Sequence, residues 1–374
     1  MGMARDRLLR FGYRRLVKPL LFRMDPETVH DRMVSFGQLL GRSASLRALT
    51  AALFSYEHPS LARNILGIRF ANPVGLAAGF DKNAELLEIL PAVGFGFAEV
   101  GSITGEPCEG NPRPRLWRLV KSRGLVVHYG LKNKGCERIA AQLRGRRFAI
   151  PIGTSIAKTN SPATTDTSAG IADYAKVFRA FADIGDYFAV NISCPNAYGG
   201  EPFVDPDRLD ALLRELDRIQ TSKPVFLKLP SGLATAELEA LLVVAGRHRV
   251  AGFICTNLTK DRHAPHIVDP LPDRGGVSGK PLAELADETI RQVYGCTKGR
   301  YTIIGCGGIF SAEDAYRKIR LGASLVQLIT GMIFEGPQLI SEINRGLVWL
   351  LKRDGFQNIS EAVGVDNPIS YVQF

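Results

Sequence analysis

Short apolar segments recur along this sequence between residues 73 and 329, and most gaps between them carry a helical pattern. Each segment is rich in β-branched and aromatic residues and is bounded by turn formers, which predicts a buried strand. The eight predicted strands are residues 73–77, 97–102, 150–156, 187–192, 225–229, 252–256, 302–305 and 325–329. The predicted helices between them are residues 84–93, 173–183, 207–219, 235–245, 282–294 and 312–321. This alternation favours an α/β fold of the (β/α)8 TIM-barrel type over an open doubly wound sheet, which is the alternative.

The carboxyl ends of the predicted strands carry the candidate functional residues, because barrels of this kind place their chemistry there. Polar groups and glycines gather at these ends, whereas the strand bodies are apolar. In chain order the candidates are Gly79, Lys82, Ser102, Lys158, Asn191, Cys194, Asn196, Lys228, Thr256, Asn257, Gly307, Gly308, Thr330 and Gly331. We therefore expect one polar rim that forms the site.

The fourth predicted strand ends in a hexapeptide that runs from Asn191 to Asn196. Its two carboxamides each donate and accept hydrogen bonds, so they suit an amide-rich ring. The thiol of Cys194 can act as a nucleophile or a base, and Pro195 ends the strand. Taken alone, the hexapeptide also fits a buried structural cysteine beside a turn.

Glycines follow the seventh and eighth predicted strands, at Gly305–Gly308 and at Gly331. Barrels commonly bind phosphate at these two strand ends through backbone N–H groups. The rim has no paired acid and base for hydrolysis and no predicted metal cluster, which favours a redox cofactor. Lys228 could stabilise a reduced flavin; a Schiff-base lysine is the rival interpretation.

The net charge of +10 has its strongest local source in the first 23 residues, where arginines and lysines alternate with apolar residues. No window there approaches the roughly 18 uncharged apolar residues of a spanning helix. This pattern predicts a segment that lies on an anionic membrane surface, and a solvated helix packed on the main domain is the alternative. Nucleic-acid binding is disfavoured because no recognition motif accompanies the charge.

The cysteine pattern indicates a reducing environment. The six cysteines lack paired spacing, and no secretory leader is apparent. Together with the basic segment, this predicts a peripheral protein on the cytoplasmic side of the membrane.

A second helix is predicted after the basic segment, because Asp25, Pro26 and Glu27 form a helix opening. Apolar residues recur at helical spacing up to Gly41, and a third helix is expected at residues 45–54. His30 lies beside the apolar stripe, where a lone histidine is more often packed or exposed than a ligand. We expect a helical segment at residues 1–57 and a barrel at residues 58–374.

With these features in place, the chain resembles the dihydroorotate dehydrogenases of the quinone-linked, membrane-associated class (class 2). The resemblance extends over residues 12–365. The motifs that carry it are residues 21–27, 72–82, 114–119, 191–196, 256–257, 275–282 and 304–309. Jointly these motifs are highly specific for that family.

The resemblance implies FMN-dependent oxidation of (S)-dihydroorotate to orotate in pyrimidine biosynthesis, with electrons passed to membrane quinone. The positions that would contact FMN are Ala78, Gly79, Lys82, Ser102, Asn191, Lys228, Thr256, Gly279, Gly308 and Thr330. The positions that would hold the substrate are Lys82, Asn191, Asn196 and Asn257. Cys194 falls on the catalytic base, and His30 and Arg118 fall near the quinone head group.

The proton-transfer positions depart from the class 2 pattern. Cys194 matches the soluble class 1 enzymes, whereas class 2 members usually have serine. Leu131 and Ala197 match class 1 as well, in place of phenylalanine and threonine. The resemblance thus implies a class 1-like cysteine base in a class 2 chain.

The substrate and cofactor positions depart from the family too. Val127 occupies a position where the family has an asparagine that binds the substrate carboxylate. Leu258 occupies a position where the family has a threonine or serine. Thr159 replaces an asparagine that contacts FMN, and Ile329 replaces a tyrosine. These departures keep two alternatives open: a flavin-dependent oxidoreductase for a less polar substrate, and a non-catalytic flavin-binding protein at the membrane.

Overall fold

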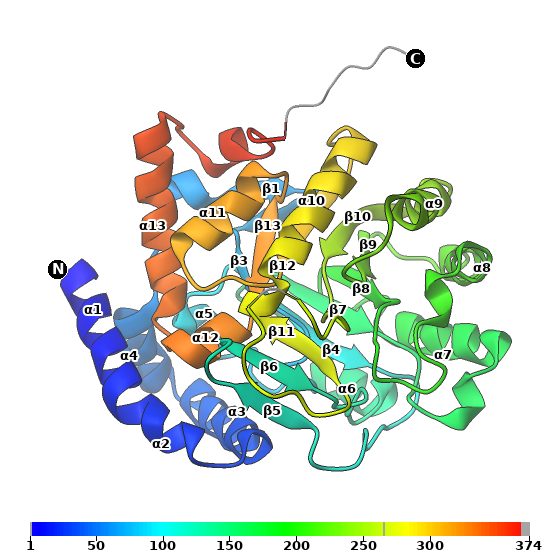
Figure 1. The fold of residues 1–374 in the computed structure, drawn as a ribbon, viewed down its shortest axis with the longest axis horizontal. Coiled ribbons are helices and arrows are strands. Elements are labelled where there is room, and N and C mark those ends of the chain that lie inside the picture. The colour runs from blue at the N-terminus through cyan, green and yellow to red at the C-terminus, as the bar shows by residue number, and fades with distance from the viewer. Residues whose placement is uncertain (1, 265, 368–374) are drawn as a thin grey trace.

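Eight parallel strands close into a barrel in a computed structural model that describes residues 2–264 and 266–367 (Figure 1). Neighbouring strands in the barrel follow the order of the chain, as (β/α)8 connectivity requires. The strands are β3 (Val74–Leu76), β4 (Phe97–Ile103), β7 (Ile152–Ile156), β8 (Tyr187–Asn191), β9 (Val225–Leu229), β10 (Val250–Cys255), β12 (Thr302–Cys306) and β13 (Leu325–Leu328). All eight predicted strands are confirmed, and so is the barrel.

Helices cover the outside of the barrel. They are α6 (Cys136–Leu143), α7 (Thr167–Ala180), α8 (Pro206–Asp217), α9 (Thr235–Ala245), α10 (Ala283–Thr297), α11 (Ala312–Arg320) and α13 (Leu339–Asp354). In α8, for example, Leu209, Leu212, Leu213 and Leu216 are buried at helical spacing. The sequence reasoning missed α6, α13 and the short helix α12 (Thr330–Glu335).

The helix predicted at residues 84–93 is wrong over most of its length. Only α5 (Leu90–Val93) is helical, at the end of that range. Ala84 has a φ of 57°, which a right-handed helix excludes. The Asp81 carboxylate binds the backbone N–H groups of Glu85 (2.7 Å) and Leu86 (2.8 Å), and so holds the segment in a turn.

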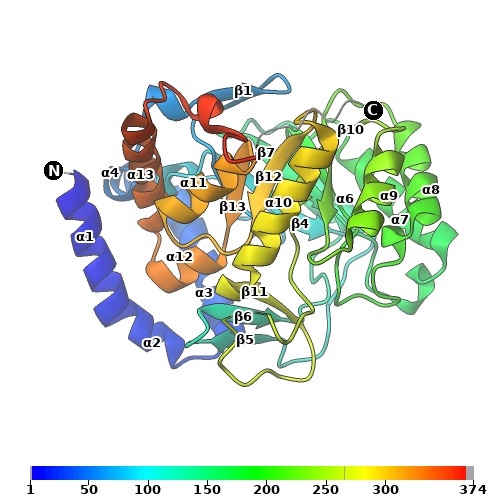
Figure 2. The same cartoon turned by 45° about the horizontal axis from the view of Figure 1, so that its top comes forward.

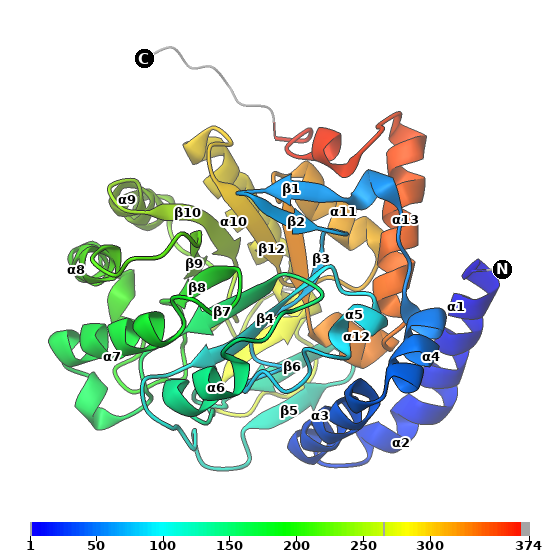
Figure 3. The same cartoon turned by 180° about the vertical axis from the view of Figure 1, so that it is seen from behind.

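A hairpin closes the amino-terminal end of the barrel. Its strands are β1 (Arg63–Ile65) and β2 (Ile68–Phe70), drawn beside β3 and β12 in Figure 3. The Phe70 ring contacts Phe97 edge-on, with centroids 5.4 Å apart, inside a cluster of buried residues from the strands. This end is therefore filled, and the carboxyl-end rim is left for the site.

A three-stranded antiparallel sheet flanks that rim. Its strands are β5 (Leu116–Leu119), β6 (Gly124–Val127) and β11 (Gly276–Gly279), in the order β11-β6-β5. They come from the loops that follow β4 and β10, and Figure 2 shows them below the barrel strands, near α3. The sequence reasoning did not predict this sheet, because its two halves are far apart in the chain.

Four helices precede the barrel: α1 (Gly2–Gly12), α2 (Lys18–Phe22), α3 (Pro26–Arg42) and α4 (Ala44–Phe54), with a π-helical turn at Tyr13–Val17. The Asp25 carboxylate caps α3 by accepting the Thr28 N–H at 2.7 Å, so the predicted helix opening is confirmed. In the described residues, none of the helices combines the length and apolar character that crossing a bilayer requires.

Glu27 fastens α3 to the barrel. Its carboxylate is 3% exposed and pairs with Arg115 (2.8 Å), Arg113 (3.0 Å) and Lys132 (3.7 Å), all from the segment that follows β4. Burial opposes the charge, but the hydrogen bonds and charges of the two arginines prevail and lower the Glu27 pKa to about 2. A buried carboxylate with this many partners fixes the helix against the barrel mouth.

Glu27→Gln should destabilise the protein by about 3 kcal/mol at pH 7, the value of a pKa shift of this size. A lowered pKa stabilises the fold above the unfolded value and is lost as the pH falls toward 2. The difference between wild type and variant should therefore shrink between pH 5 and pH 3. Denaturant unfolding followed by circular dichroism measures it. Glu57→Gln, at an exposed position, is the matched control; a pH-independent difference for Glu27→Gln would contradict this account.

Candidate functional site

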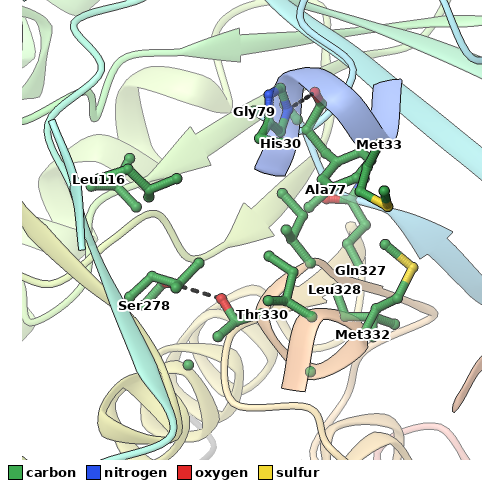
Figure 4. Close-up of a pocket in the computed structure, with 18 of the residues that line it drawn as sticks. His30, Met33, Ala77, Gly79, Leu116, Ser278, Gln327, Leu328, Thr330 and Met332 are labelled. Carbon is green, nitrogen blue, oxygen red and sulfur yellow. Dashed lines mark hydrogen bonds between the residues drawn. The ribbon is translucent and has the colours of Figure 1, made fainter. Parts of the chain in front are cut away.

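One continuous cavity of about 780 Å³ extends from the barrel mouth to the N-terminal helices. Its mouth end is polar and its far end is apolar. The far end is lined by Leu9, Val29, Met33, Phe36, Leu40 and Phe54. Figure 4 shows the transition between them, with His30 and Met33 of α3 on one side and Ser278 and Thr330 on the other.

Most of the site residues predicted from the sequence line this cavity. Those that do are His30, Ala78, Gly79, Lys82, Ser102, Arg118, Cys194, Asn196, Lys228, Thr256, Asn257, Gly279, Gly308 and Thr330. Asn191 lies just behind the wall and is 7% exposed. Parallel closure brings these residues together, since every strand ends at the same rim.

The carboxamides at the mouth form one hydrogen-bonded group. Asn191 donates from Nδ2 to Ser102 Oγ at 2.9 Å, and its Oδ1 accepts from Asn257 Nδ2 at 3.0 Å. Asn257 also donates to the Ser193 carbonyl at 2.8 Å. The ends of β4, β8 and β10 are thereby locked to one another, which fixes the orientation of both amide side chains.

Asn196 is held by the three-stranded sheet. Its Nδ2 donates to the Val127 carbonyl at 2.9 Å, and its Oδ1 lies 3.2 Å from His128 Nδ1. Asn196 follows β8, as does the rest of the hexapeptide, but its side chain is held by the sheet and not by Asn191 or Asn257. The wall beside it is apolar, because Val127, Leu131 and Leu258 also line this end.

Cys194 lies in the cavity wall between the carboxamides. Burial raises the pKa of its thiol to about 11, and the positive charge of Lys158 offsets this only in part. Lys158 donates to the Tyr198 carbonyl at 2.6 Å. At neutral pH Cys194 is therefore a thiol, and a basic form becomes available only as the pH rises.

The three predicted lysines have different surroundings. Lys82 Nζ lies 4.0 Å above the Tyr129 ring, and burial lowers its pKa to about 7. Lys228 is 5% exposed and its Nζ lies 3.8 Å from the Glu99 carboxylate inside the barrel. Lys228 borders the cavity, whereas Lys158 does not.

The residues at the mouth fit a phosphate-bearing flavin. In the described part of the chain, Lys228 Nζ has no acceptor within hydrogen-bonding distance, so it can face an anionic ring edge. A Cβ at Gly308 (φ 73°) would come within 2.4 Å of Ala283. A Cβ at Gly279 (φ 90°) would come within 2.4 Å of the Arg123 carbonyl. Only glycine leaves the backbone N–H groups there approachable.

Thr159 does not line the cavity. Its hydroxyl and its backbone N–H both bind the Asp173 carboxylate, at 2.9 Å and 2.7 Å. The resemblance had placed it at a cofactor-contacting position, and this chain uses it to tie the end of β7 to α7 instead.

His30 and Arg118 border the cavity where it leaves the mouth. The His30 Nε2 lies 2.8 Å from the Phe80 carbonyl, a contact marked by a dashed line in Figure 4. The Arg118 guanidinium donates to the Met24 carbonyl at 2.7 Å and lies over the Phe22 ring. Both side chains are thus anchored at the start of the apolar end.

Three residues of the site escaped the sequence reasoning. Tyr129 lies beneath both Lys82 and Arg115, and its buried hydroxyl has no protein partner among the described residues. Ser278 joins Thr330 through their hydroxyls at 2.9 Å. Glu99 could have been found from the sequence, since it is the one acidic residue in the apolar strand predicted at residues 97–102. Tyr129 and Ser278 lie outside the predicted strands, and no local sequence pattern marks them.

The fold and this cavity define a (β/α)8-barrel protein whose site lies at the carboxyl ends of the strands. Residues 60–351 match the family model described as dihydroorotate dehydrogenase. The chain belongs to the dihydroorotate dehydrogenase family.

Relatives in that family match almost end to end. A dihydroorotate dehydrogenase (quinone) from Gloeobacter violaceus is 41% identical over 94% of this chain and 98% of its own length. One from Roseiflexus castenholzii is 40% identical over 94% of this chain and 96% of its own. The crystal structure of DHODH from Eimeria tenella in complex with ferulenol has a TM-score of 0.81 at 29% identity, covering 94% and 98% of the two chains.

Proposed function

We propose that this protein oxidises (S)-dihydroorotate to orotate with FMN and passes the electrons to membrane quinone, a step of de novo pyrimidine biosynthesis. The continuous cavity between the barrel mouth and the N-terminal helices carries the proposal, because it joins a polar mouth suited to a ring to an apolar passage. Such a shape suits two half-reactions that share one cofactor. The names of the relatives, dihydroorotate dehydrogenase (quinone), support both halves.

FMN, when bound, supplies the two-electron acceptor of the first half-reaction and the donor of the second. Gly279, Gly308 and Thr330 are suited to hold its phosphate, and Lys228 is suited to its anionic ring edge. The remaining tasks fall to the residues of this chain. Asn257 and Asn191 are proposed to orient the substrate ring: Asn257 lines the mouth, and Asn191, just behind the wall, accepts its hydrogen bond and fixes the amide.

Cys194 is proposed as the base that takes a proton from the substrate ring, a class 1-like feature in a class 2 chain. It lines the mouth together with Asn196 and Lys82, the proposed partners of the substrate's polar edge. Proton abstraction beside a carbonyl needs a base within reach of the ring, and the thiolate provides one. The raised pKa makes that thiolate scarce at neutral pH.

Anaerobic addition of dihydroorotate to the FMN-loaded protein should bleach the flavin absorbance, and quinone should restore it. Stopped-flow spectroscopy separates the two steps. Bleaching without restoration by quinone would remove the second half of the proposal. A protein that neither binds FMN nor bleaches would contradict it entirely.

A less polar substrate is the second candidate, and the apolar wall formed by Val127, Leu131 and Leu258 favours it. A carboxylate placed against such a wall loses hydrogen-bond partners, at a cost of about 1–3 kcal/mol each. The same stopped-flow experiment with dihydroorotate methyl ester and with 5,6-dihydrouracil decides between the candidates. Faster bleaching by these compounds would favour the second candidate, and bleaching by none of the three would favour a non-catalytic role.

Cys194→Ala should retain FMN but reduce it about 100-fold more slowly, the usual scale for loss of a general base. In the wild type this rate should rise with pH from 7 toward 11, because the raised pKa makes the active thiolate more abundant as the pH rises. The variant should lose this pH dependence. Cys296→Ala, at an exposed cysteine, is the control; equal rates in wild type and Cys194→Ala would show that the thiol is structural.

Residues 1–57 are proposed as the membrane and quinone segment, and residues 58–374 as the FMN-binding barrel. Exposed apolar side chains on α1, the π-helical turn and α2 support this: Leu8 (72% exposed), Phe11 (60%), Leu16 (66%) and Leu20 (63%). Basic residues alternate with them, as they do in segments that lie on anionic headgroups. The protein would then be peripheral, on the cytoplasmic side of the membrane.

Reversing two exposed charges, in the double variant Arg7→Glu/Arg15→Glu, should weaken binding to anionic vesicles at least tenfold. Each basic residue near an anionic surface contributes about 1 kcal/mol, and reversal adds repulsion. Sedimentation with phosphatidylglycerol vesicles measures this. Arg208→Glu/Arg247→Glu is the control: Arg208 is in α8 and Arg247 follows the end of α9, and both helices lie on the opposite side of the molecule from α1 (Figure 1). Equal losses in both variants would contradict a specific membrane face.

A further inference from the structure

Lys82, His30 and Asp31 form a line of side chains from the cavity toward the surface. Lys82 Nζ lies 3.3 Å from His30 Nε2, and His30 Nδ1 lies 3.3 Å from Asp31 Oδ1. The Asp31 side chain is 52% exposed. The line therefore begins at the cavity wall and ends in solvent.

A second pocket of about 550 Å³ lies on the other side of these residues. Besides Lys82, the charged residues in its lining are Asp31, Asp81, Glu85, Glu106, Glu109, Glu137, Lys132, Lys134 and Arg138. The residues that border both this pocket and the main cavity are His30, Phe80, Lys82, Tyr129 and Lys132. His30 and Lys82 thus form part of a thin partition between the two spaces.

The two neighbours of His30 Nε2 favour opposite protonation states of this nitrogen. The Phe80 carbonyl, 2.8 Å away, can only accept, so it favours a proton on Nε2. A protonated Lys82 can only donate, so it favours a lone pair there. An Nδ1–H that donates to Asp31 leaves Nε2 with that lone pair. Nε2 is therefore placed both to take a proton from Lys82 and to hold it briefly against Phe80.

The pKa values of Lys82 and His30 are consistent with proton transfer between them. Burial lowers the Lys82 pKa to about 7, so the amine gains and loses a proton near neutrality. Burial and the nearby Lys82 charge lower the His30 pKa to about 4, so a proton placed on Nε2 leaves again readily.

The quinone half-reaction needs a proton from solvent. Dihydroorotate loses one proton to the base and a second proton with two electrons to the cofactor. A quinone takes two electrons and two protons to become a quinol. The cofactor returns two electrons and one proton, so the second proton has to enter at the quinone end.

We propose that Lys82 and His30 deliver this proton from the second pocket, with Asp31 as the positioning residue that holds the His30 tautomer. A Lys82 N–H bond breaks as the His30 Nε2–H bond forms; that bond then breaks as an O–H bond forms on the quinone. Lys82 regains its proton from solvent in the second pocket. The carboxylate of Asp31 supports the transient positive charge on the imidazole. This inference rests on the proposed function.

Asp31→Asn tests the relay, because it removes the carboxylate charge and keeps the shape of an exposed side chain. Flavin reduction by substrate should change much less than the quinone step, because Asp31 reaches Lys82 only through its charge. Reoxidation at saturating short-chain ubiquinone should slow about tenfold or more, with a larger solvent isotope effect, as for loss of acid–base assistance. Reoxidation by ferricyanide, which takes electrons and no proton, should be unchanged. Asp31→Glu should restore most of the quinone rate.

Glu109→Gln is the matched control: it removes the same charge from an exposed residue of the same pocket and should leave every rate unchanged. His30→Gln gives a second measurement, since its amide can still donate to the Phe80 carbonyl but cannot pass on a proton; it should slow only the quinone step. Equal ubiquinone rates in wild type and Asp31→Asn would overturn the relay alone. A wild type that does not reduce ubiquinone at all would overturn the proposed function and the relay with it.

Discussion

Parallel closure of the barrel is the constraint on which the rest of the structure depends. Every strand ends at one rim, so residues that are far apart in the chain meet there. The hairpin fills the opposite end with Phe70, and the site can therefore form only at the rim. Glu27 then fastens α3 over that rim through a buried ion pair with Arg115, which extends the cavity from the polar mouth into an apolar passage.

Desolvation governs the chemistry of the groups around the cavity. It keeps Cys194 protonated at neutral pH, and it makes Lys82 and His30 easier to deprotonate. These shifts favour neutral forms in an enclosed site, where unpaired charges are costly. The charges that remain fixed are held by partners, as Glu27 is by its two arginines and its lysine. Charged partners thus distinguish Glu27, which stays ionised although it is buried, from Cys194, Lys82 and His30, whose neutral forms burial favours.

An apolar wall lies beside Cys194 at the mouth of the cavity. The side chains of Val127, Leu131 and Leu258 border the mouth without offering hydrogen bonds, while the carboxamides of Asn191, Asn196 and Asn257 gather on its polar side. Under the proposed function, the ring and its substituent therefore face different walls of the mouth. The apolar wall then governs which substituent the substrate can carry.

The sequence by itself determined the eight strands, the polar rim and the α3 helix opening, because hydrophobic spacing, glycines and capping residues are local signals. The hexapeptide at the end of β8 likewise identified its carboxamides and thiol as candidate functional groups. Only the tertiary structure decided that residues 84–89 form a turn, where Asp81 binds the backbone, and that β5, β6 and β11 pair across the chain. The protonation of Cys194 and the contact of Lys82 with His30 were decided there too, since burial and long-range distances have no signature in local sequence.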